Sequence, residues 1–268
     1  MKRINFYFLM IMILLAACSG SEILPEKEGR IIVLMYHRIV EASTANTYER
    51  SATDFENDIK YLNDNNIKVI NFQDLAHIKE TGILPSANCA ILTFDDGDVS
   101  WYTIVRPILL KYELEGTFFL WTLNIGNKTY VDWSQVEYMS RYIYPDGRRP
   151  FTFESHSVSH PYLSGSKANY TNSLDYERFL DYELGESKRI IESHTLLPVT
   201  ILALPFGDGA GDQGIIAASE RNGYKMIRTS VRGAIDNSNT DLYNLPSLPV
   251  LNNTSIDQIS MFLNTQLK

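Results

Sequence analysis

The chain has 268 residues, 44% of them hydrophobic, and its 24 lysines and arginines against 32 aspartates and glutamates give a net charge of −8 at pH 7. This acidic balance disfavours nucleic acid or anionic lipid as a main partner, because both are polyanions that bind cationic surfaces. Two cysteines, Cys18 and Cys89, do not make a disulfide framework, and the length suits one large domain with a substantial core.

Residues 1–17 have the form of an export signal rather than part of a fold. Lys2 and Arg3 precede an apolar run over residues 4–15, which is too short for a normal membrane-spanning helix. Small residues then lead to Cys18, a pattern that resembles a bacterial lipoprotein signal, cleaved before a cysteine that carries the lipid. An uncleaved anchor and an ordinary export signal with a chance cysteine are the alternatives.

The lipoprotein interpretation divides the chain into a signal peptide over residues 1–17, a lipid-anchored polar tether over 18–29 and one domain over 30–268. Lipid on Cys18 would hold the protein in the cell envelope, at the periplasmic or extracellular face of a bacterial membrane. Loss of the two basic signal residues would take the net charge from −8 to −10. We expect no nucleic acid partner, and the sequence identifies no protein partner.

Short apolar runs alternate with helical patterns from residue 31 onward. The expected strands are 31–36, 68–70, 90–94, 116–121, 152–154, 199–204, 225–231 and 248–251. The expected helices are one that begins with the capping box at Thr53, then 73–80, 102–111, 133–139, 176–191, 215–222 and 255–263. This β-α alternation predicts a parallel sheet with helical crossovers, closed into a barrel. The chemistry of such barrels collects at the carboxyl ends of the strands.

Two adjacent carboxylates, Asp95 and Asp96, end one of these expected strands. A regular strand would point them to opposite sides, but Gly97 allows a sharp turn that brings both into one pocket. Two close carboxylates repel each other unless a cation is present, so the pair suggests a metal ion. A polar turn without a metal is the alternative interpretation of Asp-Asp-Gly alone.

Two histidines at ligand spacing, His156 and His160, follow a later expected strand. Imidazole suits zinc and similar metals, and two imidazoles with one carboxylate leave open coordination positions for water and substrate. Two solvated loop histidines are the alternative. Because both motifs follow strands, we expect them to share one site at the carboxyl edge of the sheet.

The motifs resemble those of the polysaccharide deacetylases, the NodB-homology or carbohydrate esterase family 4 group. Residues 93–97 (TFDDG) match its first motif, and residues 155–161 (SHSVSHP) match its second, histidine motif. Residues 204–207 (LPFG) resemble its third motif, and residues 33–37 (VLMYH) resemble the opening strand of the poly-N-acetylglucosamine deacetylase subgroup. The resemblance covers roughly residues 31–250.

This resemblance implies a single-domain, distorted (β/α)7 barrel that removes acetyl groups from a glycan with the help of a divalent metal ion. It implies that Asp96, His156 and His160 bind the metal, which we expect to be zinc, with cobalt or nickel as alternatives. It also implies that Asp95 is the general base. The metal would lower the pKa of bound water and polarise the acetyl carbonyl.

The resemblance also implies that Pro205, Phe206 and Gly207 form a wall of the substrate groove. Trp133 is similar to a family position near this groove and is a candidate for stacking on a sugar ring. A core position for Trp133 is the alternative, because it is a single aromatic residue between valines.

The sequence departs from the common family pattern at two positions. The arginine that orients the base two residues before the motif proline is replaced by Ala203, and the late segment around Ser247 contains no histidine to act as the acid. In the subgroup resembled, an early histidine can supply the acid, so we assign His37 as the general acid. A structural histidine at a strand end is the alternative.

The sequence therefore predicts a metal-dependent hydrolase of an acetylated polysaccharide, most simply an N-deacetylase acting on poly-N-acetylglucosamine, a chitin-like glycan or peptidoglycan. An esterase that removes O-acetyl groups from xylan or another glycan would use the same metal and base. A catalytically inactive glycan-binding lipoprotein is the rival from another class. The missing arginine and late histidine favour that rival, whereas Asp95, Asp96 and the two motif histidines argue against it.

Overall fold

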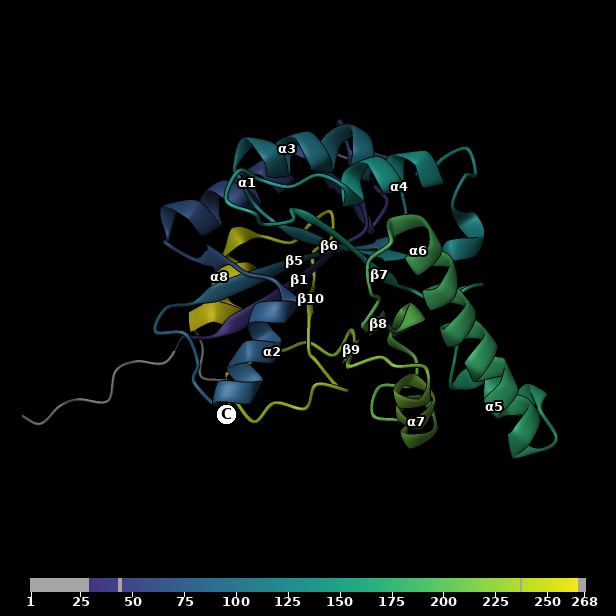
Figure 1. The fold of residues 1–268 in the computed structure, drawn as a ribbon. Coiled ribbons are helices and arrows are strands. Elements are labelled where there is room, and N and C mark those ends of the chain that lie inside the picture. The colour runs from purple at the N-terminus through teal and green to yellow at the C-terminus, as the bar shows by residue number, and fades with distance from the viewer. Residues whose placement is uncertain (1–28, 43–44, 237, 265–268) are drawn as a thin grey trace, which may run out of the picture.

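The computed structural model describes residues 29–42, 45–236 and 238–264 (Figure 1). Its centre is a curled parallel sheet in the order β10-β1-β5-β6-β7-β8-β9, with β4 added beside β5. The strands of this sheet are β1 (Ile31–Tyr36), β4 (Lys68–Val69), β5 (Cys89–Asp96), β6 (Gly116–Leu120), β7 (Phe151–Ser155), β8 (Ile201–Ala203), β9 (Met226–Arg228) and β10 (Leu248–Pro249). The predicted parallel β/α architecture is therefore confirmed, with every expected strand in place.

The segment at residues 245–249 closes most of the gap between the two ends of the sheet. Leu245 donates its N–H to Ile227 of β9 at 2.9 Å, and its carbonyl accepts from Thr229 at 2.9 Å. Three residues later, Leu248 pairs with Leu34 of β1. One short segment thus joins β9 to β1, which gives the sheet its barrel-like curl.

Alternate residues of each strand face the barrel interior, and the others face the helices. Ile31 and Val33 belong to the interior cluster of buried residues, whereas Ile32 and Leu34 belong to the larger cluster beneath the helices. A strand that is covered on both faces needs apolar residues on both, which explains the continuous apolar runs in the sequence.

Eight α-helices are present in the described residues, and most of them cover the outside of the sheet (Figure 1). They are α1 (Ala52–Asp64), α2 (Phe72–Thr81), α3 (Arg106–Lys111), α4 (Trp133–Ser140), α5 (Ser173–Asp181), α6 (Ser187–Thr195), α7 (Gln213–Arg221) and α8 (Ile256–Asn264). Figure 1 shows α5 and α6 as one long rod, and the turn that joins them, Tyr182–Glu186, is π-helical.

Two local predictions need correction. The first helix begins two residues earlier than the expected capping box at Thr53, because the Ser51 hydroxyl accepts from the Asp54 N–H at 3.0 Å and caps α1. The helix over 102–111, for which the sequence leaves open a kink or a second part at Pro107, divides into a π-helical turn, Trp101–Val105, and α3. Pro107 lies in the first turn of α3, directly after the π-helical turn.

A small second sheet was not predicted. Its strands, β2 (Arg38–Val40) and β3 (Glu49–Ser51), pair in parallel next to the end of β1. Both strands are only three residues long, so their sequence carries too little periodicity to be recognised.

The predicted signal peptide over residues 1–17, the lipidated Cys18 and residues 18–28 of the tether lie outside the described residues. Within the part of the chain that the structure describes, no helix is both long enough and apolar enough to cross a membrane.

Candidate active site

The candidate residues meet in a cavity of about 470 Å³ at the carboxyl ends of the strands. Asp95 and Asp96 end β5, His156 follows β7, and His37 follows β1. The cavity is lined by Met35, His37, Asn46, Tyr48, Asp95, Asp96, His156, His160, Leu204, Phe206, Gly207, Arg228, Ser230, Arg232, Pro249 and Leu251. A smaller hollow of about 210 Å³ shares His37 and the two aspartates and extends the depression toward Tyr130.

Asp96, His156 and His160 turn one donor atom each toward a common point. The Nε2 atoms of the two histidines lie 3.1 Å apart, and Asp96 Oδ1 lies 3.5 Å from His156 Nε2 and 3.4 Å from His160 Nε2. Donor atoms bound at about 2.0–2.1 Å to one tetrahedral zinc ion lie roughly 3.3 Å apart. The spacing of the three side chains therefore fits a divalent metal ion.

The hydrogen bond of His156 supports the same fit. Its Nδ1 lies 2.8 Å from the carbonyl oxygen of Ala203, which can only accept, so Nδ1 carries the proton. Nε2 then presents its lone pair to the other two donors, which is the tautomer that a metal ligand needs. Ala203, at the position where the family pattern has an arginine, thus contributes its backbone carbonyl to this arrangement.

The turn that brings both aspartates into the cavity begins at Asp96 itself. Asp96 has φ 84°, a conformation that is rare for a residue other than glycine, and Gly97 continues the turn with φ 102°. Burial favours the neutral carboxyl and would raise the pKa of Asp96. The hydrogen bonds of His156 and His160, together with the charges of His156 and His37, outweigh burial and hold that pKa well below its usual range.

Asp95 is buried and forms an ion pair that the sequence did not reveal. Its Oδ2 accepts from Nη2 of Arg228, which is 1% exposed, enters from β9 and also lies over the Phe119 ring at 5.1 Å. Asp95 Oδ1 is buried without a hydrogen-bond partner among the described residues. The sequence signal for Arg228 was a lone arginine inside an apolar strand, which requires a buried anion nearby.

Arg228 therefore places a guanidinium beside Asp95, although the position two residues before Pro205 is Ala203. The motif arginine is absent from the sequence, and a different strand, β9, brings an arginine to this carboxylate. The register explains it: Met226 of β9 lies in the interior cluster, so Arg228, two residues later, also points inward, toward Asp95 of β5.

His37 lies at the edge of the cavity, between β1 and β2. The indole Nε1 of Trp101 donates to its carbonyl oxygen at 3.1 Å, and its ring lies 4.9 Å from that of Tyr48. Its Nδ1 is buried and has no partner in the described part of the chain. Burial lowers the pKa of His37, and the charges of Asp95 and Asp96 partly oppose this shift.

The predicted groove wall forms a single 3₁₀ turn, Pro205–Gly207. Phe206 has φ 58° and is 56% exposed, and its ring stacks on Tyr162 at 4.2 Å and meets the edge of His160 at 4.5 Å. A Cβ on Gly207 would lie 1.7 Å from the Ser230 hydroxyl, so no larger residue fits there. Phe206 and Gly207 line the cavity, whereas Pro205 is buried behind them.

Trp133 is not brought to this cavity. It begins α4, where its ring stacks on His194 of α6 at 4.1 Å, and His194 in turn pairs with Glu137 at 2.9 Å. The sequence could not separate this packing role from sugar stacking, because both require an aromatic residue beside apolar neighbours.

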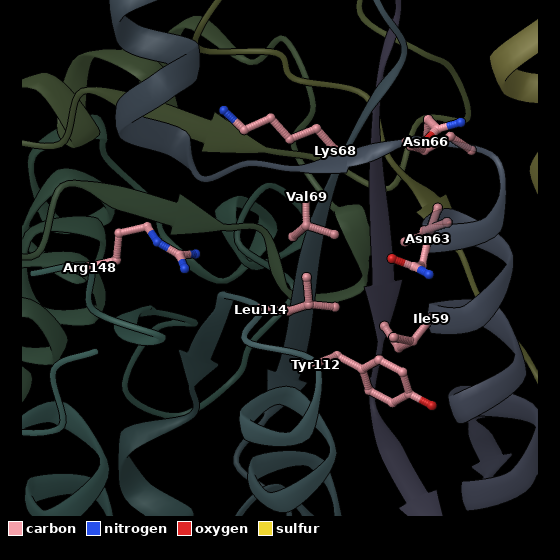
Figure 2. A pocket seen from close by; sticks show the side chains of 10 residues that line it. Ile59, Asn63, Asn66, Lys68, Val69, Tyr112, Leu114 and Arg148 are labelled. Atoms are coloured by element: carbon pink, nitrogen blue, oxygen red, sulfur yellow. The ribbon is translucent and has the colours of Figure 1, made fainter. Parts of the chain in front are cut away.

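Another cavity, of about 370 Å³, lies near the amino ends of the strands, between α1, β4 and the end of α3. Figure 2 shows Val69 and Leu114 at its centre, with Arg148 on one side and Asn63 on the other. Its lining contains no histidine or carboxylate, so it offers neither the metal donors nor the base of a hydrolytic site.

Comparisons with known proteins agree with this geometry. The sequence pattern of the polysaccharide deacetylase family matches residues 84–227. YxkH of Bacillus subtilis (strain 168), named for the same family, is 27% identical over 216 residues, which are 81% of this chain and 70% of YxkH. The poly-beta-1,6-N-acetyl-D-glucosamine N-deacetylase of Staphylococcus aureus (strain MSSA476) is 25% identical over 198 residues, 69% of this chain and 67% of that protein.

Solved structures show the same fold. The structure of the Streptococcus pyogenes deacetylase PplD in complex with acetate superposes with a TM-score of 0.75 at 21% identity, over 89% of this chain and 100% of PplD. IcaB from Ammonifex degensii superposes with a TM-score of 0.72 at 20% identity, over 89% of this chain and 98% of IcaB. The predicted distorted (β/α)7 fold is thereby confirmed. With a family pattern that spans more than half of its length, this chain belongs to the polysaccharide deacetylase family and is a hydrolase of that family.

Proposed function

We propose that this chain is a metal-dependent N-deacetylase of an N-acetylglucosamine polysaccharide, held in the cell envelope by lipid on Cys18. The observation that carries the proposal is the arrangement of Asp95 beside three convergent metal donors. One of its carboxylate oxygens pairs with Arg228, and the other has no hydrogen-bond partner among the described residues. The relative named as a poly-beta-1,6-N-acetyl-D-glucosamine N-deacetylase supports the choice of substrate.

Asp96, His156 and His160 would hold a divalent cation, for which we propose zinc. When bound, such an ion supplies an activated water and a positive charge that polarises the acetyl carbonyl. The donor set of two imidazoles and one carboxylate is typical of catalytic zinc sites, which keep coordination positions open.

Asp95 is proposed as the general base. Its Oδ2 is fixed by Arg228, so its Oδ1 is free to take a proton from water as the water oxygen attacks the acetyl carbon. The buried guanidinium keeps the carboxylate in one orientation and places a positive charge beside it.

His37 is proposed as the general acid. Breaking the bond between the acetyl carbon and the sugar nitrogen yields acetate and an amine, and that nitrogen must gain a proton as it leaves. His37 lines the same cavity as the histidine pair, its ring lies beside that of Tyr48, and its Nδ1 has no partner in the described residues. Burial lowers the pKa of His37, and the charges of Asp95 and Asp96 partly oppose this shift toward the neutral ring.

The test measures acetate release by the purified chain after chelation and reloading with zinc, cobalt or nickel. We expect the loaded protein to release acetate from β-1,6-linked N-acetylglucosamine oligomers and the chelated protein to release little. Asp95→Asn should bind the metal with unchanged stoichiometry yet lose about 10²–10⁴-fold in kcat, the range for loss of a general base.

Each alternative has its own outcome in this assay. Release from acetylated xylan but not from N-acetylated oligomers would show an O-acetyl esterase. Binding of an oligomer with no acetate release by any metal-loaded form would refute the enzyme proposal. His37→Ala should lower kcat, whereas His77→Ala, which changes an exposed histidine on α2, should not. Equal rates for the two variants would return His37 to a structural role.

A further inference from the structure

The loop that carries His160 is held in an unfavourable backbone conformation. Ser157 and His160 have φ values of 67° and 57°, in the left-handed region. This region costs a residue with a Cβ roughly 1–2 kcal/mol, so other contacts must hold the loop in place. His160 can meet His156 and Asp96 only while this conformation persists.

Carbonyl groups of the loop bond to the segment that follows β6. The N–H of Thr122 donates to the Ser157 carbonyl at 3.3 Å, and the N–H of Leu123 donates to the Val158 carbonyl at 3.0 Å. Within the loop, the Ser157 hydroxyl accepts from the N–H of His160 at 3.0 Å. These contacts leave the N–H groups of Val158 and Ser159 to be satisfied from another element.

Glu183 satisfies both of them. Its Oε2 accepts from the N–H of Val158 at 3.0 Å and of Ser159 at 2.8 Å, and its Oε1 accepts from the Ser159 hydroxyl at 2.6 Å. The side chain is 3% exposed, and no basic side chain of the described residues pairs with it. The buried carboxylate is therefore bonded to this loop alone, and these bonds to a charged acceptor are of the stronger kind.

The π-helical turn between α5 and α6 places Glu183 there. The turn spans Tyr182–Glu186, and single π turns within helices are frequent at functional sites because they redirect side chains. Gly185 in the same turn allows close approach to the neighbouring helix end, since a Cβ at that position would lie 2.4 Å from Asn222 Oδ1.

We propose that Glu183 is a positioning residue, which sets the affinity of the metal site by fixing the loop that presents His160. This inference rests on the proposed function, in which His160 binds the metal. Glu183 itself touches neither the metal donors nor the cavity; it acts through the backbone of residues 158 and 159. Groups that orient a metal ligand typically change metal affinity by about 10–100-fold when removed.

The experiment compares Glu183→Ala and Glu183→Gln with the parent protein. Cobalt affinity is measured by competition with a chromophoric chelator, and the visible spectrum of bound cobalt reports on its ligands. Glu183→Ala should lose about 10–100-fold in affinity and change the spectrum, because His160 is no longer held. Glu183→Gln should lie within a few-fold of the parent, since its carbonyl oxygen can accept both N–H groups and its amide can donate to the serine hydroxyl.

Two controls separate positioning from general stability. Glu186→Ala removes another carboxylate of the same π-helical turn, one that pairs only with Arg189 at the surface, and should leave cobalt affinity unchanged. Leu109→Ala removes a buried side chain of α3 that makes no hydrogen bond to this loop, and it should lower the melting temperature without changing cobalt affinity.

Two results would overturn the proposal. The first is a Glu183→Ala protein that is folded by circular dichroism and binds cobalt as tightly as the parent. If Glu183→Ala does not fold, Glu183→Asp, which keeps the charge but is one methylene shorter, takes its place, and the second result is parent-like cobalt affinity in that variant. A parent protein that binds no cobalt would instead refute the proposed metal site, and with it this role of Glu183.

Discussion

Asp95 has two carboxylate oxygens in different surroundings, and this difference gives the residue its proposed role. Arg228 holds one oxygen, and the other has no hydrogen-bond partner among the described residues. A buried carboxylate without a cation would carry a large desolvation penalty, so the guanidinium both orients the group and permits its charge in the interior. Met35 Sδ and the Phe119 ring surround that guanidinium and exclude water from it.

We expect Arg228→Met to lower both stability and turnover. The substitution leaves Asp95 as an unpaired buried charge, and breaking a buried pair in this way costs about 3–5 kcal/mol. Urea unfolding of the metal-free protein measures the loss, and acetate release should fall with little change in KM, because the base is no longer oriented. Arg221→Met is the matched control.

The control pair is exposed, since the side chains of Arg221 and Asp181 are 46% and 44% accessible. Exposed pairs contribute at most about 1 kcal/mol, so Arg221→Met should have a small effect on unfolding and none on turnover. An Arg228→Met protein as stable and as active as the Arg221→Met protein would contradict both roles assigned to Arg228.

The candidate site could be predicted from sequence as far as local motifs reach. Asp95, Asp96, His156 and His160 occur in two short motifs, each after a strand, and the structure brings all four together. The ion pair of Arg228 with Asp95 could not be predicted, because the two residues are 133 positions apart and pairing across a barrel depends on strand register. The location of Trp133 could not be predicted either, because the ring that it stacks on, that of His194, belongs to a different helix.

At the scale of elements, the predicted helices and strands are nearly all present, and their ends are the less accurate part. The strand predicted over 199–204 pairs only over Ile201–Ala203, and that predicted over 225–231 only over Met226–Arg228. Hydrophobic runs continue into loops that are also buried, so hydrophobicity alone does not define where ladder pairing ends.

Glu154 of β7 bonds to the residues that lead into β8, and it should make stability depend on pH. Its Oε2 accepts from the N–H groups of Thr200 and Ile201 at 2.7 and 2.8 Å, yet burial raises its pKa to about 8. An unfolded glutamate releases its proton near pH 4.3, so between that pH and about 8 the folded chain holds the extra proton. Stability from this group therefore falls as pH rises through this window.

We expect Glu154→Gln to remove this dependence, because glutamine can accept the same two N–H groups and does not titrate. Urea unfolding between pH 6.5 and 8 should show a parent slope of at most about 1.4 kcal/mol per pH unit from this one proton, and a flatter profile in the variant. Glu186→Gln, at a half-buried position, should keep the parent slope. Superimposable profiles for the parent and Glu154→Gln would show that Glu154 is ionised in the folded chain throughout.

At the scale of the whole molecule, the start of the domain and the active site lie at opposite edges of the sheet. Gly29 donates its N–H to Pro85, and Ile31 at the start of β1 pairs with Cys89 at the start of β5. His37, Asp95 and Asp96 lie at the other ends of the same two strands. Six strand residues span roughly 20 Å, so a tether attached at this edge would leave the cavity directed away from its anchor.

This arrangement leads to a prediction for the proposed anchor. Cys18→Ser should move the protein from the membrane fraction to the soluble fraction, because the residue that would carry the lipid is lost. Its kcat/KM on soluble oligomers should stay within about twofold of the parent, since Gly29, the first described residue, and the cavity lie at opposite edges of the sheet. Ser19→Ala is the matched control and should remain in the membrane fraction. Mass spectrometry of the mature amino terminus checks the lipid itself: an unmodified Cys18, or a Cys18→Ser protein that stays with the membrane, would rule out this anchor.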